Sequence, residues 1–415
     1  MLLPVLKQLL LLKMEYKIRQ LFLNDKAEAE KEFAKIKAAP HGIRIMSEKL
    51  FNLVLKIKEV DNKAANIIKQ EMLSRNGEAV LSRDSIYLGS EKSDIIIFGT
   101  EKSIRSLAEK MKSQPFGLKL LSEELKNFLD HINDSAKKNS LKIAGKIFSA
   151  GEKPLIMGIL NTTPDSFYDG GKYLNAGKAV ERALQMIAEG ASIIDLGGMS
   201  TRPGSEEADT EEEEIKRTIP VIKEIKRQSD VVISIDTYRS RVAEKAIDAG
   251  ADIINDISGL VLDSEMIKTV SSTKAYIVIM HMKGTPKDMQ INPVYKDVTE
   301  EIYSFLYTQA NSAIKSGIEK DRIIIDPGIG FGKTVEDNYT ILKNIEEFKS
   351  LNMPILIGAS RKSFIGKVLN LLPEERLEGS LAVASYCAVK GVDILRVHDV
   401  KETLRAVKVI NAMRI

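Results

Sequence analysis

Three side chains that accept hydrogen bonds stand at the ends of separate short apolar runs in this chain of 415 residues. They are Asp236, Asn255 and Asp326. Two carboxylates and an amide form a set rich in acceptors, in which only the amide can also donate. A matching ligand has a flat amino-amidine edge with several N–H donors, as pterins and purines do. The aspartates could instead only cap the following helices, but three residues at equivalent positions favour a binding site.

Cationic side chains follow the last two apolar runs. Lys362, Arg396 and His398 stand there, in the part of the chain where barrel enzymes often bind phosphate. The arginine offers a fork of donors to phosphate oxygens, and the lysine offers a movable charge. Arg396 and His398 are two residues apart, so we expect them to point the same way along a strand. These residues predict an anion site, with surface salt bridges as the alternative interpretation.

Two polar loops follow the first two apolar runs. Residues 161–167 begin with Asn161, whose amide oxygen can bind Mg²⁺, a hard cation usually held jointly with substrate phosphates. Residues 200–204 place hydroxyls and a guanidinium between a Gly-Gly and a Pro-Gly pair. We expect such loops to close over a charged intermediate and exclude water. The glycine-rich residues 328–333 lack the GxxxxGK[ST] spacing, so we do not predict a nucleotide triphosphatase.

The elements that must position these residues are eight short apolar runs, separated by helical patterns. Nearly every run ends in a polar residue. This arrangement is typical of a (β/α)8 barrel, whose active site is assembled at the carboxyl ends of its strands. We therefore predict an α/β fold, a (β/α)8 TIM barrel that spans residues 141–415. The runs are Ile156–Leu160, Ile193–Leu196, Val231–Ile235, Ile253–Ile254, Tyr276–Met280, Ile323–Ile325, Ile355–Ile357 and Ile394–Leu395.

Residues 1–140 are predicted to form a smaller α+β domain of unknown role. Leu53–Val60 alternates apolar and charged side chains, which is the period of a half-exposed strand, and Ala64–Arg75 has the pattern of a helix. Met1–Leu12 is apolar but too short to span a membrane. Met14 is an alternative start, which would leave residues 1–13 outside the domain. The domain sequence has no cluster of histidines, cysteines or carboxylates, which favours an interaction or structural module.

Composition argues against several classes of protein. A formal net charge of +3 gives no support for a nucleic-acid partner or an acidic membrane surface. The single cysteine, Cys387, excludes an internal disulfide framework, and we expect it to be a small buried residue. The low cysteine content agrees with a cytoplasmic enzyme, which is the location that we expect.

A series of sequence blocks resembles the dihydropteroate synthase family. The blocks follow the order of the family and together span essentially all of residues 150–415. They are MGILNTTPDSFYDGG at 157–171, GGMSTRPG at 197–204, SIDT at 234–237, INDISG at 254–259, MHMKGTP at 280–286, DPGIGFGK at 326–333, SRKSFIG at 360–366, ERLEGSLA at 375–382 and RVHDV at 396–400.

The resemblance implies a reaction of folate biosynthesis. Members of the family join p-aminobenzoate to 6-hydroxymethyl-7,8-dihydropterin diphosphate and give 7,8-dihydropteroate and pyrophosphate. The implied pterin site comprises Asp236, Asn255, Asp326, Lys362 and Met280. The implied catalytic residues are Lys362, Arg396, His398 and Asp326. No covalent enzyme intermediate and no dedicated strong base are required.

The same resemblance implies two further subsites and a partner. The diphosphate is implied to bind Asn161, Arg396 and His398, joined by Arg202 when its loop closes, with Mg²⁺ held at Asn161. The implied p-aminobenzoate pocket contains Thr201, Pro203, Phe331 and Ser363. Ser363 stands near the start of a predicted helix, which is a natural place for a carboxylate. Because members of the family are typically dimeric, we expect a homodimer.

The chain departs from the family at one position, and alternatives stay open. Met199 stands where the family commonly has glutamate, beside the second polar loop, and this change could alter the choice of acceptor. The alternatives are the same reaction with a substituted arylamine of the methanopterin type, a pterin-dependent methyltransferase, and a pterin-binding protein without catalysis. The fifth apolar run ends at His281, for which no firm role is predicted.

Overall fold

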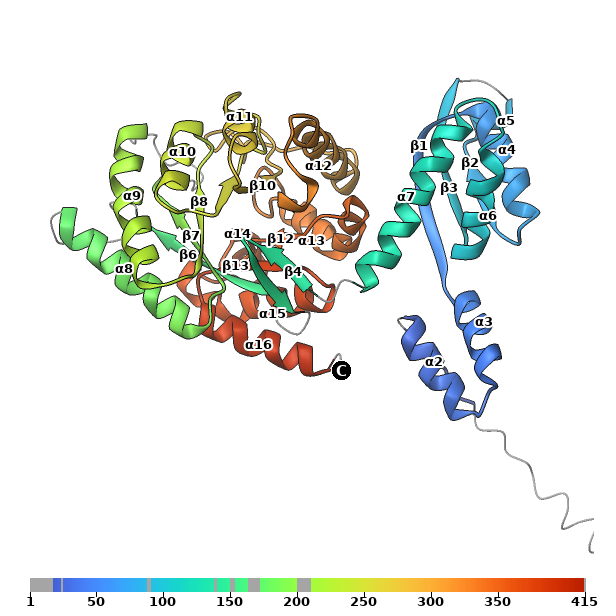
Figure 1. The fold of residues 1–415 in the computed structure, drawn as a ribbon, viewed down its shortest axis with the longest axis horizontal. Helices are drawn as coiled ribbons and strands as arrows, with labels where there is room; N and C mark the ends of the chain where they lie inside the picture. Colours follow the sequence, from blue (N-terminus) through green and yellow to red (C-terminus); the bar gives the residue numbers. More distant parts are fainter. Residues whose placement is uncertain are drawn as a thin grey trace, which may run out of the picture. The chain divides into compact units, whose positions relative to one another are not determined.

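The computed structural model describes residues 18–23, 25–87, 91–137, 140–149, 154–162, 172–199 and 210–413. The chain divides into two compact units, Met1–Asn133 and Asp134–Ile415. The division lies a few residues before the boundary expected from the sequence, and residues 1–13 lie outside the described part. The first unit combines a small sheet with helices, and the second is a barrel (Figure 1).

The amino-terminal unit is built on a three-stranded antiparallel sheet with the strand order β1-β3-β2. The alternation seen in the sequence directs Leu53, Leu55 and Ile57 of β1 onto the core. Asp61 then accepts backbone N–H bonds from Lys63 and Ala64 and begins α4. The elements are α2 (Lys26–Lys35), α3 (Pro40–Leu50), β1 (Asn52–Asp61), α4 (Asn62–Leu73), β2 (Glu78–Leu81), α5 (Arg83–Tyr87), β3 (Lys92–Thr100), α6 (Glu101–Met111) and α7 (Leu118–Lys137).

The second unit is the predicted (β/α)8 barrel, and each of the eight apolar runs is a strand. The strands are parallel and follow the order β11-β10-β9-β8-β7-β6-β13-β12. A bridge between Ile325 and Ile355 joins the two ends of this sheet and closes the barrel. The strands are β6 (Leu155–Asn161), β7 (Ile193–Gly197), β8 (Val232–Asp236), β9 (Ile253–Asp256), β10 (Tyr276–Met280), β11 (Ile323–Asp326), β12 (Leu356–Ile357) and β13 (Ile394–Val397).

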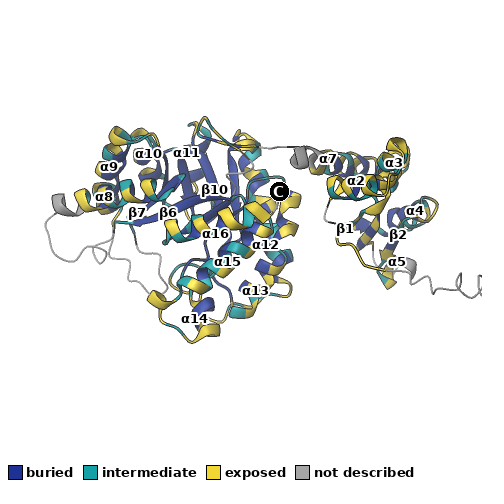
Figure 2. Cartoon of the chain, turned by 90° about the horizontal axis from the view of Figure 1, so that it is seen from below, coloured by how far each residue is buried: buried dark blue, intermediate teal, exposed yellow. Residues whose placement is uncertain are grey.

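Helices surround the barrel, with buried faces toward the strands and exposed faces outward (Figure 2). Cys387 lies on α15 and is fully buried, as expected, and burial raises the pKa of its thiol to about 12. Within the described ranges, no helix is both long and apolar enough to cross a membrane. The helices are α8 (Lys172–Glu189), α9 (Glu211–Gln228), α10 (Ser240–Asp248), α11 (Met266–Ser271), α12 (Val298–Lys315), α13 (Val335–Lys343), α14 (Ser363–Leu369), α15 (Leu377–Val389) and α16 (Val400–Met413).

A β-hairpin that the sequence analysis missed precedes the first barrel strand. Its strands are β4 (Ser140–Ile143) and β5 (Lys146–Ser149). Leu141 and Ile143 pack in one apolar cluster with residues at or near the beginnings of the barrel strands, such as Leu155 and Ile193. The hairpin therefore closes the amino-terminal end of the barrel interior, and the opposite end, where the strands finish, is left for polar side chains.

We predict that Ile143→Ala lowers the unfolding free energy of the barrel by about 2–5 kcal/mol, because a fully buried isoleucine leaves a cavity when it is truncated. Ile147→Ala is the matched control, since Ile147 lies on the same hairpin and is 71% exposed. Urea unfolding of the full chain, followed by circular dichroism, measures both. Equal midpoints for the two variants would show that the hairpin does not stabilise the barrel.

Candidate active site

The structure brings the predicted acceptor set together at the carboxyl-terminal edge of the barrel. Asp236 is the last residue of β8, and it is paired in register with Asn255 on the neighbouring strand β9. Asp326 ends β11 and is paired with Met280 on β10. The carboxyl group of Asp326 accepts a 2.7 Å bond from the backbone N–H of Gly328. Asn255, Asp326 and Met280 are buried, so this edge of the barrel presents hydrogen-bonding groups from a region that excludes most water.

A carboxylate that was not predicted, Asp195, joins this set from β7. Arg396 reaches across from β13, and its Nε lies 2.5 Å from Oδ2 of Asp195. A terminal nitrogen of the same guanidinium lies 2.6 Å from Oδ2 of Asp236. The amide nitrogen of Asn255 donates to Asp195 at 3.2 Å. The clue in the sequence was a charged residue inside the apolar run Ile193–Leu196, because a charge in a buried strand needs a partner.

Burial governs the charges of this cluster. It raises the pKa of Asp236 to about 7, against the opposing effect of Arg396. It also raises the pKa of Asp326 above its ordinary value, against the N–H bond from Gly328. Burial acts to lower the pKa of Arg396, but Asp195 and Asp236 outweigh it, so this pKa stays above its usual value. Arg396 is therefore a permanent cation beside Asp236, a carboxyl group that can titrate near neutral pH.

Lys362 stands between the acceptor set and Phe331. Its ammonium lies 4.3 Å from the centre of the Phe331 ring and donates to the carbonyl of Ile329. Burial lowers the pKa of Lys362 to about 7, although Asp326 acts to raise it. A Cβ atom on Gly330, whose φ is +83°, would come within 2.8 Å of the Lys362 side chain. The absence of a side chain at Gly330 thus lets Lys362 lie across this loop.

The loops after β12 and β13 are tied together by residues that the sequence analysis did not single out. The guanidinium of Arg361 makes two bonds to Asp399, at 2.8 and 2.7 Å. Arg361 itself has a φ of +57°, a conformation that is costly for an arginine and that this ion pair helps to hold. The hydroxyl of Ser360 lies 3.1 Å from Nδ1 of His398. These contacts fix the loops that carry Lys362 and His398.

His281, which had no predicted role, is a buried partner of Lys333. Burial lowers the pKa of His281 to about 2, so the ring is neutral, and its Nδ1 lies 3.0 Å from the Lys333 amine. Lys333 also donates to the carbonyl oxygens of His281 and Phe331, at 3.2 and 2.9 Å. Gly328 has a φ of +71°, and any Cβ there would overlap the His281 carbonyl. Lys333 therefore braces the turn that carries Phe331, and its buried amine is engaged by His281 and Phe331.

Arg396 and His398 make different contacts, although they were expected to point the same way. Arg396 extends to β7 and β8, whereas His398 contacts Ser360 in the loop after β12.

Asn161 ends β6 and is half-buried, on the strand next to β7. Ser363 is the first residue of α14 and is exposed.

The second polar loop, residues 200–204, lies outside the described residues. Thr201, Arg202 and Pro203 lie outside the described residues, whereas Met199 is half-buried just before them.

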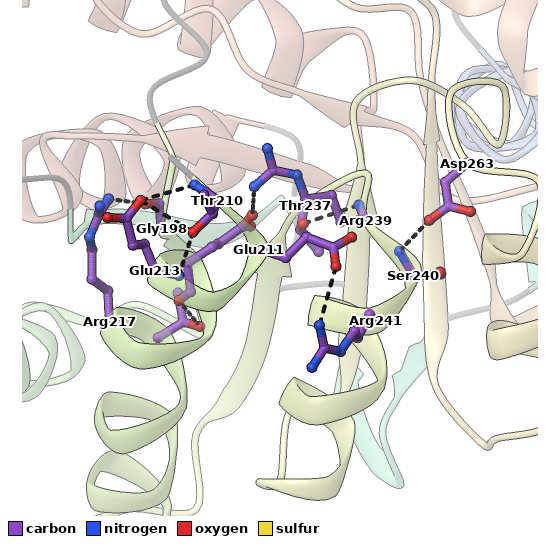
Figure 3. A network of polar contacts seen from close by, with 12 residues as sticks. Gly198, Thr210, Glu211, Glu213, Arg217, Thr237, Arg239, Ser240, Arg241 and Asp263 are labelled. Atoms are coloured by element: carbon purple, nitrogen blue, oxygen red, sulfur yellow. Dashed lines mark hydrogen bonds and ion pairs between the residues drawn. The ribbon is translucent and has the colours of Figure 1, made fainter. Parts of the chain in front are cut away.

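Figure 3 shows the contacts on either side of this loop. Arg217 of α9 donates to the carbonyl of Gly198 at 3.0 Å. Thr210 and Glu213 form a reciprocal cap at the start of α9, and the backbone N–H of Ser240 at the start of α10 donates to Asp263 at 2.7 Å.

Among the described residues, Asn161 is the predicted metal ligand that lies at this edge. No group of three or more His, Cys, Asp or Glu side chains that could enclose a metal occurs in the ranges that the structure describes. Asn161 offers one neutral oxygen at the end of β6. That donor fits Mg²⁺ bound mainly through substrate phosphates and water, which is the usual way that proteins hold this ion.

Comparisons with known proteins agree with this geometry. Residues 157–398 match the family described as "Pterin binding enzyme". The dihydropteroate synthase of Synechocystis sp. is 44% identical over 274 residues, which cover 66% of this chain and 94% of that protein. A solved structure of dihydropteroate synthase from Xanthomonas albilineans in complex with 7,8-dihydropteroate matches with a TM-score of 0.59 and 38% identity, covering 66% of this chain and 98% of that one.

A third relative extends the match beyond the barrel. It is a probable bifunctional folylpolyglutamate synthase/dihydropteroate synthase of Haloferax volcanii, 37% identical over 362 residues, which cover 86% of this chain and 42% of that protein. Because this share of the chain exceeds the barrel unit, the alignment must enter the amino-terminal unit. From the matched family, the barrel and these relatives, the chain belongs to the pterin-binding enzymes and, among them, to the dihydropteroate synthase family.

Proposed function

We propose that this chain joins p-aminobenzoate to 6-hydroxymethyl-7,8-dihydropterin diphosphate and releases 7,8-dihydropteroate and pyrophosphate. The observation that carries this conclusion is the buried cluster at the strand ends of a barrel of this family. Acceptors for a donor-rich heterocycle, Asp236, Asn255 and Asp326, adjoin the cations Arg396 and Lys362. A flat ring and an anionic leaving group can therefore be held side by side.

The acceptor set is proposed to bind the pterin ring. Asp236, Asn255 and Asp326 take the amino-pyrimidine edge, and Met280 lines the pocket, supported by its burial beside Asp326 in the strand register. Lys362 contacts the ring from the next loop, supported by its electrostatic interaction with Asp326. Buried acceptors reject ligands that lack the matching donors, because those ligands would leave the carboxyl groups unpaired.

The cations and Asn161 are proposed to hold the diphosphate. Arg396 and His398 donate to its oxygens, and Arg202 joins them from the loop after β7. Asn161 would supply one oxygen to Mg²⁺, and this ion would neutralise charge on the diphosphate. Support for His398 comes from its place just after β13, where its ring contacts the hydroxyl of Ser360 in the loop after β12.

The arylamine is proposed to lie beside Lys362, in a pocket made by Thr201, Pro203, Phe331 and Ser363. Its amine nitrogen attacks the methylene carbon of the pterin and forms a C–N bond. The C–O bond to the diphosphate breaks, and its electron pair leaves with pyrophosphate. The residues Asp326, Lys362, Arg396 and His398 stabilise charge during this exchange, and the amine proton passes to solvent. The turn braced by Lys333 and His281 keeps Phe331 in place.

We propose that the enzyme is a homodimer. The late helices carry exposed apolar side chains, including Val389 on α15 and Val409 and Met413 on α16. Such a surface is suited to packing against a second copy. The mass of the purified particle in solution tests this proposal.

We predict pyrophosphate release when the purified chain is given the pterin diphosphate, Mg²⁺ and p-aminobenzoate. Asp326→Ala is expected to lower the rate by about 100-fold or more, because one removed transition-state contact commonly costs 10²–10³ in kcat. The matched control is Asp337→Ala on α13, an aspartate whose carboxyl group caps that helix and does not belong to the acceptor set. Near-normal turnover of Asp326→Ala would contradict the assignment.

The same assay separates the alternatives. Met199, half-buried at the edge of the loop, is the observation that favours a substituted arylamine of the methanopterin type. Release only with bulkier arylamines would replace p-aminobenzoate by such an acceptor. No release with any arylamine would reject the synthase and favour a pterin-dependent methyltransferase or a binding protein without catalysis.

We predict a bell-shaped dependence of kcat/KM on pH, centred near pH 7. Asp236 binds ring donors best when ionised, and its pKa is raised to about 7, so activity rises with pH through that value. Lys362 is cationic only below its lowered pKa of about 7, so activity falls above it. Lys362→Arg keeps the charge at higher pH and should remove the alkaline fall up to about pH 9. An unchanged alkaline limb in this variant would exclude Lys362 as its cause.

A further inference from the structure

We infer that Asp195 is a positioning residue that keeps hold of Arg396 while the pterin takes the place of the guanidinium on Asp236. This inference rests on the proposed function and deepens it. In this role, Asp195 couples binding of the ring at Asp236 to placement of the Arg396 cation on the diphosphate.

The contacts of Arg396 allow such an exchange because they use different nitrogens. Nε bonds to Asp195 at 2.5 Å, and a terminal nitrogen bonds to Asp236 at 2.6 Å. Rotation of the guanidinium about its bond to Asp195 can therefore break the second contact and preserve the first. Asp195 is fully buried, and an unpaired charge there would destabilise the fold. Loss of the contact with Asp195 would therefore destabilise the protein, so we expect that contact to persist.

The ring and the guanidinium compete for Asp236 because their edges are chemically alike. Each presents a planar row of N–H donors, and a carboxylate accepts either one. Oδ2 of Asp236 is bonded to Arg396, and Oδ1 has no protein partner among the described residues. A ring that uses this carboxylate loosens the hold of Asp236 on the guanidinium.

The exchange has a consequence for the leaving group. Once released from Asp236, the terminal nitrogens of Arg396 can meet diphosphate oxygens, while Nε stays on Asp195. Asn255 donates to the same oxygen of Asp195 at 3.2 Å, so Asp195 also contacts a residue of the proposed ring-binding set. A pterin without a diphosphate would displace the guanidinium and leave its terminal nitrogens without an anion. The contact between Asp195 and Arg396 should therefore strengthen binding of the diphosphate and not binding of the ring.

Affinities of two ligands test this coupling. Calorimetry with Mg²⁺ measures binding of 6-hydroxymethyl-7,8-dihydropterin with and without its diphosphate. We expect Asp195→Asn to reduce the affinity gained from the diphosphate by about tenfold, a usual size for coupling between sites. Affinity for the ring alone should change less than twofold. A purely structural role would weaken both ligands together.

Ser234→Ala is the matched control. Ser234 is fully buried on β8 and paired in register with Asp195, and its hydroxyl has no hydrogen-bond partner among the described residues. It should leave both affinities within twofold of the unmodified chain. If Asp195→Asn does not fold, Asp195→Glu, which displaces the same charge, is measured in its place.

The outcomes distinguish two failures. Equal weakening of both ligands by the Asp195 variant, or no change in either, overturns the positioning role and leaves the synthase intact. Failure of the unmodified chain to bind either pterin overturns the proposed function itself.

Discussion

The pairing of buried charge at the carboxyl ends of the strands is the constraint on which this site depends. Asp195 and Asp236 are held away from water, and Arg396 is the cation bonded to both. A buried charge without a partner destabilises a fold by several kcal/mol, so these groups must be satisfied jointly. A ligand that presents planar donors to Asp236 meets a carboxyl group that Arg396 already contacts through Oδ2. Specificity for such a ligand and stability of the barrel mouth therefore have one physical origin.

The rest of the barrel keeps this cluster in register. The hairpin of β4 and β5 fills the opposite end of the barrel, so the strands can finish in polar residues without opening the interior. At the mouth, Lys333 and His281 brace the turn that follows β11. After the neighbouring strands β12 and β13, Arg361 and Asp399 join the loops that carry Lys362 and His398. These contacts position the chemical groups that the loops carry.

Much of this arrangement could be predicted because barrels repeat a simple relation between sequence and position. A polar residue at the end of an apolar run lies at the mouth, and that rule located Asp236, Asn255 and Asp326. The rule could not find Asp195, which lies inside its run. The pairing of Lys333 with His281 depends on the left-handed turn at Gly328, and the pairing of Arg361 with Asp399 joins residues distant in sequence. The hairpin of β4 and β5 was not predicted, because two short strands joined by a tight turn show little periodic pattern in the sequence.

The central claim is that the strand-end carboxyl groups bind the pterin ring beside a cation that binds its diphosphate. A crystal structure of the chain with 6-hydroxymethyl-7,8-dihydropterin diphosphate and Mg²⁺ tests it most directly. We predict ring nitrogens within about 3 Å of Asp236 and Asp326, a hydrogen-bonding distance, with Arg396 bonded to Asp195 and to the diphosphate. A ring bound away from these carboxyl groups, with Arg396 still bonded to Asp236, would contradict the claim.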